Sequence, residues 1–575
     1  MRKNVWERKI TVRGKESIRT RRLSLRTILK RLDDVVVRLN DPKRLNEYMN
    51  IIMANRTELE ILMNLLPFDP GLKQDNECIF GHFDELHERI IGKDGTFDET
   101  IKRLESMAVL DKNVVFKIGV TRHNFFCINE MVKLCMRLKG VDCRSLEESF
   151  NVFPVDKIIH NFIEYIRGIQ EAIENASIEL FLCDEELIEI LQIIQFHMQR
   201  EKVSDRDLVR LLGVIAEHAF IGPQTIVFDP YHRCNIQCRH CFVHNPAIQH
   251  REGFLERKFS LEKFKSIIDD SAELKVDGII LQGDGEPLLY DKFFDMLRYA
   301  RSKDIGVLFF TNGSLIHEKE SRELIDLGVK EIYCSFPSGT SATYAQVTTI
   351  GTEATFNTII VNLKTLVRIR KEQGKLEPRL KMTHVIHALN YHELIEMAKV
   401  DAEIGADAAR FYLIRLDDNN QSLKLSEREI EVIKKDLPIA TKIFMENGID
   451  FVDNIMFQLE HYDKDTGAWS KDIFLQEGCT IGWYFCLIPA LYDVSMCCHL
   501  RTVGDLNKQS FKELWNSREY RRYRIKAKFL KENKGYTFLN GVKLYDEHCE
   551  HCDNHQTLIT NLDNLYRFGL YRFLR

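Results

Sequence analysis

A repeated alternation of short strand-like runs and amphipathic helical runs is the feature that most constrains the fold of this 575-residue chain. The strand-like runs are rich in β-branched and aromatic residues, and stretches with helical periodicity such as 261–274 and 356–370 separate them. Because βαβ crossovers are right-handed, this rhythm predicts an α/β fold with a parallel sheet curled into a partial (β/α)6 TIM-like barrel. All strands then end on one rim, where we expect the chemistry. The candidate strands are 225–229, 278–282, 307–311, 331–336, 380–386 and 408–413.

The barrel pattern covers only the middle of the chain, so we expect three domains. Residues 1–220 predict a helical N-terminal domain of unknown role, because apolar residues recur there at three- and four-residue spacing. Residues 221–470 hold the barrel. Residues 471–575 combine six cysteines with an aromatic-rich hairpin pattern and predict a small C-terminal domain organised by metal. The helical runs of the first region include 25–36, 59–66, 158–173 and 187–198.

Composition and charge exclude several classes of protein. An apolar share of 44% and a charged share of 29% are those of a globular chain, and a net charge of -5 gives no general attraction to nucleic acid or acidic membranes. Without a signal peptide or a long apolar span, we expect a cytoplasmic protein with no membrane partner. Basic and aromatic residues interleave in 518–534, but a solvated helix face is favoured over a nucleic-acid site. The 15 cysteines lie mostly in close clusters, which favours metal ligation over disulfides.

Cys234, Cys238 and Cys241 form a Cys-x3-Cys-x2-Cys motif directly after the first candidate strand. Thiolates are the soft ligands that iron-sulfur clusters require, and three of them leave one iron of a 4Fe-4S cluster open. A zinc site completed by His240 or His244 is the alternative. Structural zinc generally uses two separated ligand pairs, so the iron-sulfur cluster is favoured.

This motif, at the end of a first barrel strand, resembles that of the radical S-adenosylmethionine (SAM) superfamily. Residues 283–287 (Gly-Asp-Gly-Glu-Pro) are similar to the Gly-Gly-Glu-Pro segment with which that family holds the SAM amino group, with Asp284 in place of one glycine. Residues 311–313 resemble the family's Thr-Asn-Gly turn, and Ser335 stands where a polar residue often contacts the SAM ribose or carboxylate. The resemblance therefore implies a SAM site made of Gly285, Glu286, Pro287, Asn312 and Ser335.

The C-terminal cysteines bracket a predicted hairpin with strands at 483–488 and 494–498. Because side chains alternate across a strand, the adjacent Cys497 and Cys498 should point to opposite faces, and only one should readily join a given cluster. At most five thiols then compete for four ligand positions. The six cysteines are Cys479, Cys486, Cys497, Cys498, Cys549 and Cys552.

The order of these cysteines resembles the SPASM and shorter twitch domains that follow the barrel in many radical SAM enzymes. By that resemblance one auxiliary 4Fe-4S cluster is held by Cys479, Cys497, Cys549 and Cys552. Cys486 is the main rival ligand, Cys498 is a second rival, and a zinc ribbon built from the same residues is the alternative kind of site.

The resemblance implies a radical enzyme. SAM would bind the open iron and be cleaved reductively, and the 5′-deoxyadenosyl radical would take hydrogen from a substrate C–H bond. The implied partners are SAM, a reducing protein such as flavodoxin or ferredoxin, and a peptide, protein or small-molecule substrate that undergoes oxidative modification. No catalytic side chain is assigned.

Two other functions remain open from the sequence. One is a radical SAM enzyme that modifies RNA, and the other is a non-enzymatic binding protein stabilised by zinc. The N-terminal region shows neither the alternating strand and helix pattern of a cobalamin binder nor the three-strand, three-helix pattern of a peptide-leader recognition module. These absences weaken a cobalamin-dependent methyltransferase and a leader-dependent peptide enzyme, respectively.

Overall fold

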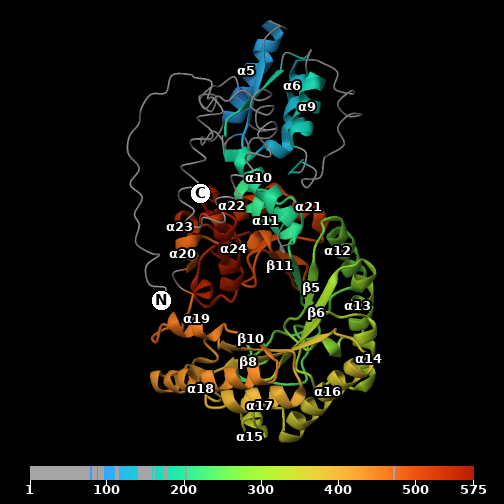
Figure 1. The fold of residues 1–575 in the computed structure, drawn as a ribbon, viewed down its shortest axis with the longest axis vertical. Coiled ribbons are helices and arrows are strands. Elements are labelled where there is room, and N and C mark those ends of the chain that lie inside the picture. The colour runs from blue at the N-terminus through green and yellow to red at the C-terminus, as the bar shows by residue number, and fades with distance from the viewer. Residues whose placement is uncertain are drawn as a thin grey trace. The chain divides into compact units, whose positions relative to one another are not determined.

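The computed structural model of the chain describes residues 78–79, 87, 96–110, 115–139, 158–159, 162–173, 176, 178–184, 186–200, 204–470 and 473–574. The chain divides into two compact units, Met1–Ser204 with Arg575, and Asp205–Leu574 (Figure 1). Helix α11 (Asp205–Ala216) belongs to the second unit, although it falls within the expected N-terminal domain.

The first unit contains a parallel sheet in addition to the expected helices. Three strands pair in the order β1-β2-β3, and both pairings are parallel. Helices α9 and α10 confirm the helical runs expected at 158–173 and 187–198, whereas those at 25–36 and 59–66 lie outside the described residues. The expectation that this region lacks alternating strands and helices was wrong. The elements are β1 (Cys78–Ile79), α5 (Thr96–Leu110), β2 (Phe116–Val120), η2 (Phe125–Cys127), α6 (Ile128–Leu138), α9 (Phe162–Ile173), β3 (Ile178–Leu182) and α10 (Glu186–Arg200).

The second unit is built on one ten-stranded sheet in the order β10-β9-β8-β7-β6-β5-β4-β11-β12-β13. All six expected barrel strands are present, as β4 to β9, and each pairs in parallel with its neighbour. Strand β10, which the sequence did not predict, extends the parallel part beyond β9. The strands are β4 (Thr225–Phe228), β5 (Gly278–Leu281), β6 (Gly306–Thr311), β7 (Glu331–Ser335), β8 (Arg379–Ile386), β9 (Ala408–Leu413), β10 (Asp450–Val452), β11 (Phe485–Ile488), β12 (Asp493–Ser495) and β13 (Thr502–Asp505).

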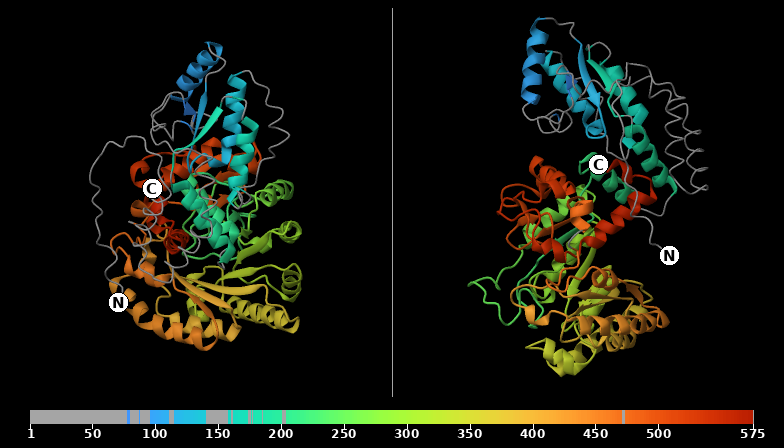
Figure 2. Two further views of the ribbon diagram at one scale, coloured as in Figure 1. Left: turned by 45° about the horizontal axis from the view of Figure 1, so that its top comes forward. Right: turned by 90° about the vertical axis from the view of Figure 1, so that its left-hand side faces the viewer.

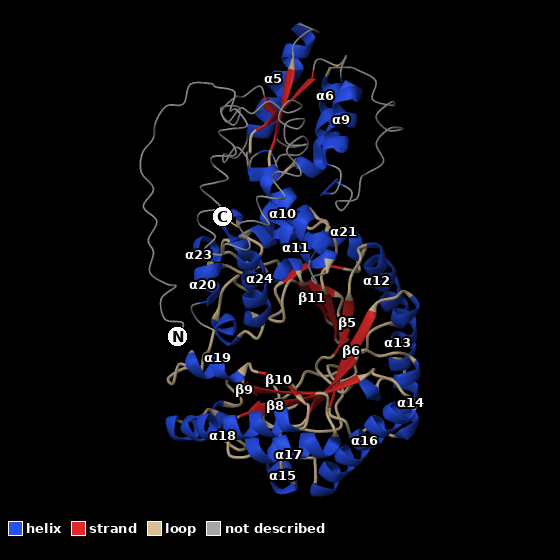
Figure 3. Ribbon diagram, viewed as in Figure 1, coloured by secondary structure: helices blue, strands red, loops and turns tan. Residues whose placement is uncertain are grey.

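Helices of the barrel cover the outer face of this curved sheet (Figures 1 and 3). In β6 the buried Val307 and Phe309 alternate with the partly buried Leu308 and Phe310, as expected when one face packs under helices and the other lines the barrel interior. The fold therefore confirms the partial barrel. Its helices are α12 (Leu261–Glu273), α13 (Phe293–Ser302), α14 (Glu318–Asp326), α15 (Ser341–Val347), α16 (Glu353–Glu372), α17 (Leu394–Ile404), α18 (Glu427–Glu446) and α19 (Ile455–Glu460), with 3-10 turns η3 (Pro287–Leu289) and η4 (Gln421–Leu423).

The C-terminal part continues the barrel sheet. Strand β11 pairs in parallel with β4, and β11, β12 and β13 then pair antiparallel, which confirms the predicted hairpin. Figure 2 shows this part, in red, beside the green first strands of the barrel. Its remaining elements are α20 (Ile473–Glu477), η5 (Ile481–Trp483), α21 (Phe511–Trp515), α22 (Arg518–Lys528), α23 (Leu530–Asn533), η6 (Glu547–His551), α24 (His555–Arg567) and η7 (Tyr571–Phe573).

Helix α22 corrects the interpretation of the basic segment 518–534 as a solvated face. Tyr520, Tyr523 and Arg524 are buried, and the Arg524 guanidinium lies 3.9 Å from the centroid of the Tyr520 ring and 4.0 Å from that of Trp515. Cation–π contacts and hydrogen bonds to the carbonyls of Gly482 and Trp515 let this arginine enter the core. Much of this segment therefore serves packing.

Among the described residues, no helix combines the length and apolar character needed to cross a membrane.

A buried ion pair joins α22 to the turn after α11 and gives a test of the packing. Lys528 Nζ lies 3.2 Å from Glu217 Oε1, and the two side chains are 5% and 1% exposed. We expect Lys528→Met to lower the free energy of unfolding by about 3–5 kcal/mol, because it leaves the Glu217 carboxylate buried without its lysine partner. Urea unfolding followed by circular dichroism measures the change. The double variant Glu217→Gln/Lys528→Met should recover most of the loss, and a single-variant effect below about 1 kcal/mol would contradict this role.

Candidate functional site

The first three cysteines lie in the loop that follows β4, at the C-terminal edge of the parallel sheet. Cys234, Cys238 and Cys241 are partly buried. Burial raises the pKa of the Cys238 thiol, and the nearby Cys241 and Cys234 raise it further, so the three thiolates repel one another when no cation is bound. A cationic iron-sulfur core removes this repulsion, and the soft donor set fits it.

Backbone hydrogen bonds fix this loop against the segment that ends α15. Arg239 N donates to Val347 O at 2.9 Å, and Thr349 N donates to Gln237 O at 2.8 Å. Within the loop, Cys241 N donates to Cys238 O at 3.1 Å. The spacing of the three thiols is therefore set by ordered backbone.

Neutral donors surround the sulfurs of this loop. The backbone N–H groups of Val243 and His244 lie 3.4 and 3.1 Å from Cys241 Sγ, and the side-chain amide of Asn312 lies 4.0 Å from Cys234 Sγ. In the described part of the chain, no lysine or arginine side chain donates to these three sulfurs.

The glycines of residues 283–287 allow this segment to lie directly against the cysteine loop. A Cβ on Gly283 would lie 2.1 Å from Asp229 Oδ1, and one on Gly285 would lie 2.3 Å from Arg233 O. Glu286 N donates to the same Arg233 carbonyl at 2.8 Å. A side chain at either glycine would push the segment away from the residues that precede Cys234.

The carboxylate of Glu286 is buried and holds the turn after β6. It accepts hydrogen bonds from Thr311 Oγ1 at 2.9 Å, from Asn312 N at 2.8 Å and from Leu288 N at 3.2 Å. Burial raises the pKa of Glu286 to about 7. In the structure Glu286 thus holds the Thr-Asn-Gly turn in place through hydrogen bonds to Thr311 and Asn312.

The other predicted SAM residues take different places. Pro287 is buried at the start of η3, and Asn312 Nδ2 donates to Asn235 Oδ1 at 2.9 Å, which links the turn after β6 to the first cysteine loop. Ser335 is the exposed last residue of β7. The structure therefore gathers Gly285, Glu286, Pro287 and Asn312 around the cysteine loop, and places Ser335 on the neighbouring strand of the rim.

Asp284, which departs from the family segment, joins a group that the sequence did not reveal. One ligand atom from each of Asp229, His232 and Asp284 lies within 4.8 Å of the others, and His232 Nε2 is 2.6 Å from Asp229 Oδ2. Burial and the nearby Asp229 raise the pKa of Asp284 to about 6. This network braces the segment against the first loop, and its atoms are close enough to hold a cation.

A cationic and aromatic cluster faces the barrel interior. Arg410 lies over the rings of Phe310, Tyr333 and Tyr412 at 5.5, 4.6 and 4.5 Å, and its Nε donates to Thr383 Oγ1 at 3.2 Å. Thr383 pairs in register with both Ser335 and Arg410. Among the described residues, the carboxylate of Asp553 interacts electrostatically with Arg410, and no hydrogen bond joins the two side chains. Strand periodicity alone could have indicated that Arg410 faces the interior.

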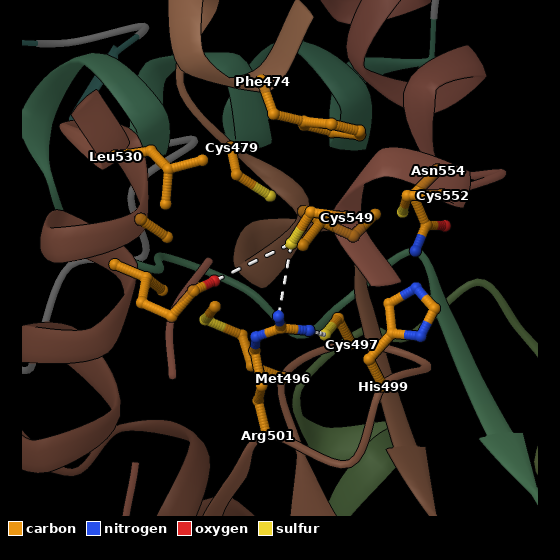
Figure 4. Close-up of a pocket in the computed structure, with 13 residues that line it drawn as sticks. Phe474, Cys479, Met496, Cys497, His499, Arg501, Leu530, Cys549, Cys552 and Asn554 are labelled. Atoms are coloured by element: carbon orange, nitrogen blue, oxygen red, sulfur yellow. Dashed lines mark hydrogen bonds between the residues drawn. The ribbon is translucent and has the colours of Figure 1, made fainter. Parts of the chain in front are cut away.

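The four predicted auxiliary ligands line one small cavity (Figure 4). Hydrogen bonds fix their backbones: Cys479 N donates to Ala527 O at 2.8 Å, and Ser470 Oγ donates to Cys549 O at 2.7 Å and accepts from Cys552 N at 3.0 Å. Four thiols around one small cavity fit a 4Fe-4S cluster. The ligands come from the loop before η5 (Cys479), the turn after β12 (Cys497), and η6 with the residue that follows it (Cys549 and Cys552).

The two rival cysteines do not line this cavity. Cys486 is buried in β11, where it pairs with Ile226 of β4. Cys498 lies outside the lining, but its sulfur is within 4.8 Å of both His499 and Cys552. Because β12 ends at Ser495, the alternation argument does not apply to Cys497 and Cys498, and both thiols lie near the cavity.

Comparisons with known proteins agree with this arrangement. Residues 229–400 match the radical SAM superfamily, and residues 479–553 match SPASM, an iron-sulfur cluster-binding domain. A tungsten-containing aldehyde ferredoxin oxidoreductase cofactor-modifying protein from Pyrococcus furiosus is 32% identical over 179 residues, 31% of this chain and 47% of that protein. The chain thus spans about half the length of that relative. An AdoMet-dependent heme synthase from Methanosarcina barkeri is 22% identical over 340 residues, 58% of this chain and 91% of the synthase.

Solved structures give more distant likenesses. Streptococcus suis SuiB bound to S-adenosylmethionine matches with a TM-score of 0.45 and 15% identity, over 68% of this chain and 91% of that structure. Native anSMEcpe with bound AdoMet matches with a TM-score of 0.41 and 14% identity, over 61% of this chain and 98% of that structure.

Fold, cysteine loops and comparisons define a SAM-dependent iron-sulfur enzyme. The chain belongs to the radical SAM superfamily and carries a C-terminal SPASM iron-sulfur domain. Its cofactors are SAM, the 4Fe-4S cluster of the barrel and auxiliary iron-sulfur in the SPASM domain. The family resemblance predicted from the sequence is confirmed.

Glu286 provides a test of how the SAM site is organised. In Glu286→Gln the side-chain NH2 group can face the Asn312 N–H, which then loses its hydrogen-bond acceptor. We therefore expect the turn after β6 to shift and the affinity for SAM to fall about tenfold, or ~1.4 kcal/mol. Calorimetric titration of the anaerobic, cluster-loaded protein with SAM measures this affinity. Glu256→Gln is the matched control, because Glu256 pairs with Arg233 at the surface, and SAM affinity there should stay unchanged. Equal affinity in the wild type and both variants would contradict the role of Glu286.

Iron content tests the two ligand sets. Replacing Cys234, Cys238 and Cys241 together with Ala should remove about four of roughly eight iron atoms per reconstituted chain, and replacing Cys479, Cys497, Cys549 and Cys552 should remove the other half. Cys486→Ala is the control and should keep all the iron. Loss of cluster iron from Cys486→Ala, or full iron content in either multiple variant, would show that the ligands are different ones.

Proposed function

We propose that this enzyme carries out an oxidative modification of a peptide, a protein or a small molecule at an unactivated C–H bond. The observation that carries the proposal is the second cavity, lined by four thiols and located in the same compact unit as the three-cysteine loop. A site with four thiolate ligands leaves no iron open for a substrate, which suits it to electron acceptance.

When bound, the reduced cluster and SAM supply the radical that takes hydrogen from the substrate. The chain's own residues bind SAM and orient it. Glu286 holds the turn that carries Asn312, and Asn312 in turn contacts the cysteine loop through Asn235. A substrate bound inside the barrel would be shielded from water by the surrounding strands.

The barrel interior beside Ser335 is the proposed place of the substrate. Ser335, Thr383 and Arg410 are aligned across three neighbouring strands, so Arg410 stands roughly 10 Å from Ser335 along the sheet. Its guanidinium is partly buried among aromatic rings, and its side-chain hydrogen bond goes to the Thr383 hydroxyl. A carboxylate or another anionic group of the substrate fits this position.

The partners in the proposal are a reducing protein such as flavodoxin or ferredoxin and a substrate of one of the three classes. Curated relatives include a cofactor-modifying protein, heme synthases and mycofactocin maturases, so their substrates differ. The alternative of an RNA substrate drew on the interleaved basic and aromatic residues of 518–534. Several of these residues in α22 are buried, so they are not available to bind RNA.

Comparison of cells with and without the gene tests this function. Untargeted mass spectrometry of metabolites and peptides should find a species that has lost hydrogen in cells with the wild-type gene and accumulates unmodified in cells with Cys234→Ala. The purified wild-type protein should release 5′-deoxyadenosine from SAM under reducing conditions, and Cys234→Ala should not. A product with an added methyl or sulfur group, or identical profiles in the two strains, would contradict an oxidative modification.

A further inference from the structure

A buried arginine that the motifs did not point to lines the cavity of the auxiliary site. Arg501 is 2% exposed, its Nη1 lies 3.4 Å from Cys497 Sγ, and its Nη2 lies 3.2 Å from Cys549 Sγ. Figure 4 shows the guanidinium between these two thiols, which come from different segments of the domain. One side chain thus bridges two of the four proposed ligands.

The surrounding chain holds this guanidinium in place. Its Nε donates to Lys543 O at 2.9 Å, and its Nη2 also donates to Asp546 Oδ1 at 2.8 Å. Its own carbonyl accepts from Met496 N at 3.0 Å, which closes the turn that carries Cys497. The geometry needs a planar fork of donors, which lysine does not have.

We propose that Arg501 sets the reduction potential of the auxiliary cluster by donating N–H···S hydrogen bonds to Cys497 and Cys549. This inference rests on the four-cysteine ligand set proposed above. Net charge and hydrogen bonds to the sulfurs are two of the factors that set the potential of an iron-sulfur cluster. Reduction adds a negative charge, so a fixed cation with two N–H donors stabilises the reduced state more than the oxidised state.

The contrast with the first site supports this role. The sulfurs of Cys234 and Cys241 meet neutral donors, and in the described part of the barrel no side-chain cation donates to the three-cysteine loop. The auxiliary site holds an arginine that donates to two of its sulfurs and also pairs with Asp546. Arg501 therefore raises the potential of the cluster that we propose as the electron acceptor.

A purely structural role for Arg501 makes a different prediction. Its bonds to Lys543 and Asp546 tie the loop before η6 to the turn after β12, so removal of the side chain could simply loosen the domain. Loosening would lower iron loading or stability. It would leave the potential of the clusters that still form unchanged.

The test measures the auxiliary cluster alone in the full-length chain. Cys234, Cys238 and Cys241 are replaced with Ala to remove the first cluster, and EPR-monitored redox titration is then applied to this background and to versions that also carry Arg501→Gln or Arg501→Lys. Arg522→Gln is the matched control, because Arg522 lies on α22 of the same domain, pairs with Glu519 and does not line the cavity.

For Arg501→Gln we expect the ratio of reduced to oxidised cluster, at the midpoint potential of the background protein, to fall about tenfold, a shift of ~59 mV to lower potential for a one-electron couple. Arg501→Lys keeps the charge but cannot bridge both sulfurs, so its shift should have the same sign and be smaller. Arg522→Gln should not shift the potential.

Three outcomes would overturn the proposal: midpoints in both Arg501 variants equal to that of Arg522→Gln, a shift to higher potential, or loss of auxiliary iron from both variants while Arg522→Gln keeps it. If the background protein itself holds no cluster that depends on the four cysteines, the ligand assignment fails.

Discussion

The parallel pairing of β11 with β4 is the contact on which the arrangement of both metal sites depends. Four residue pairs, from Phe485 with Thr225 to Ile488 with Phe228, join the SPASM domain to the first barrel strand as one continuous sheet. The same strand β4 leads into the loop of the first three cysteines, while β11 leads into the hairpin whose end carries Cys497. The two thiol sets therefore share one rigid hydrogen-bonded framework, and a change that weakens this pairing would affect both sites.

Much of this fold could be predicted because its signals are local. The six barrel strands and helices α12 and α16 follow from periodicity, and the cysteine motifs follow from their spacing. The β4 to β11 pairing joins segments that are far apart in the chain, so no local pattern reports it. Strands as short as β1 and β10 leave little periodic signal, which is why the sheet of the first unit and the last parallel strand were not predicted.

The site residues divide in the same way. Thiol ligands could be named because their chemistry and spacing are distinctive, whereas Glu286 and Arg501 act through hydrogen bonds that depend on how distant segments pack. Basic residues were the most misleading: Arg524 is buried over aromatic rings and Arg501 over thiols, although both would be placed at the surface by composition alone. Their charges are tolerated because each one meets acceptors or π-systems that replace water.

We expect the chain to hold two iron-sulfur clusters, of which only the one in the barrel has an open iron for SAM. Mössbauer spectroscopy of the anaerobic protein reconstituted with 57Fe, recorded with and without SAM, tests it most directly. We predict that SAM changes the signal of about one iron in roughly eight and leaves the others unaltered. A spectrum that SAM does not change, or one in which iron of both clusters responds, would contradict the account.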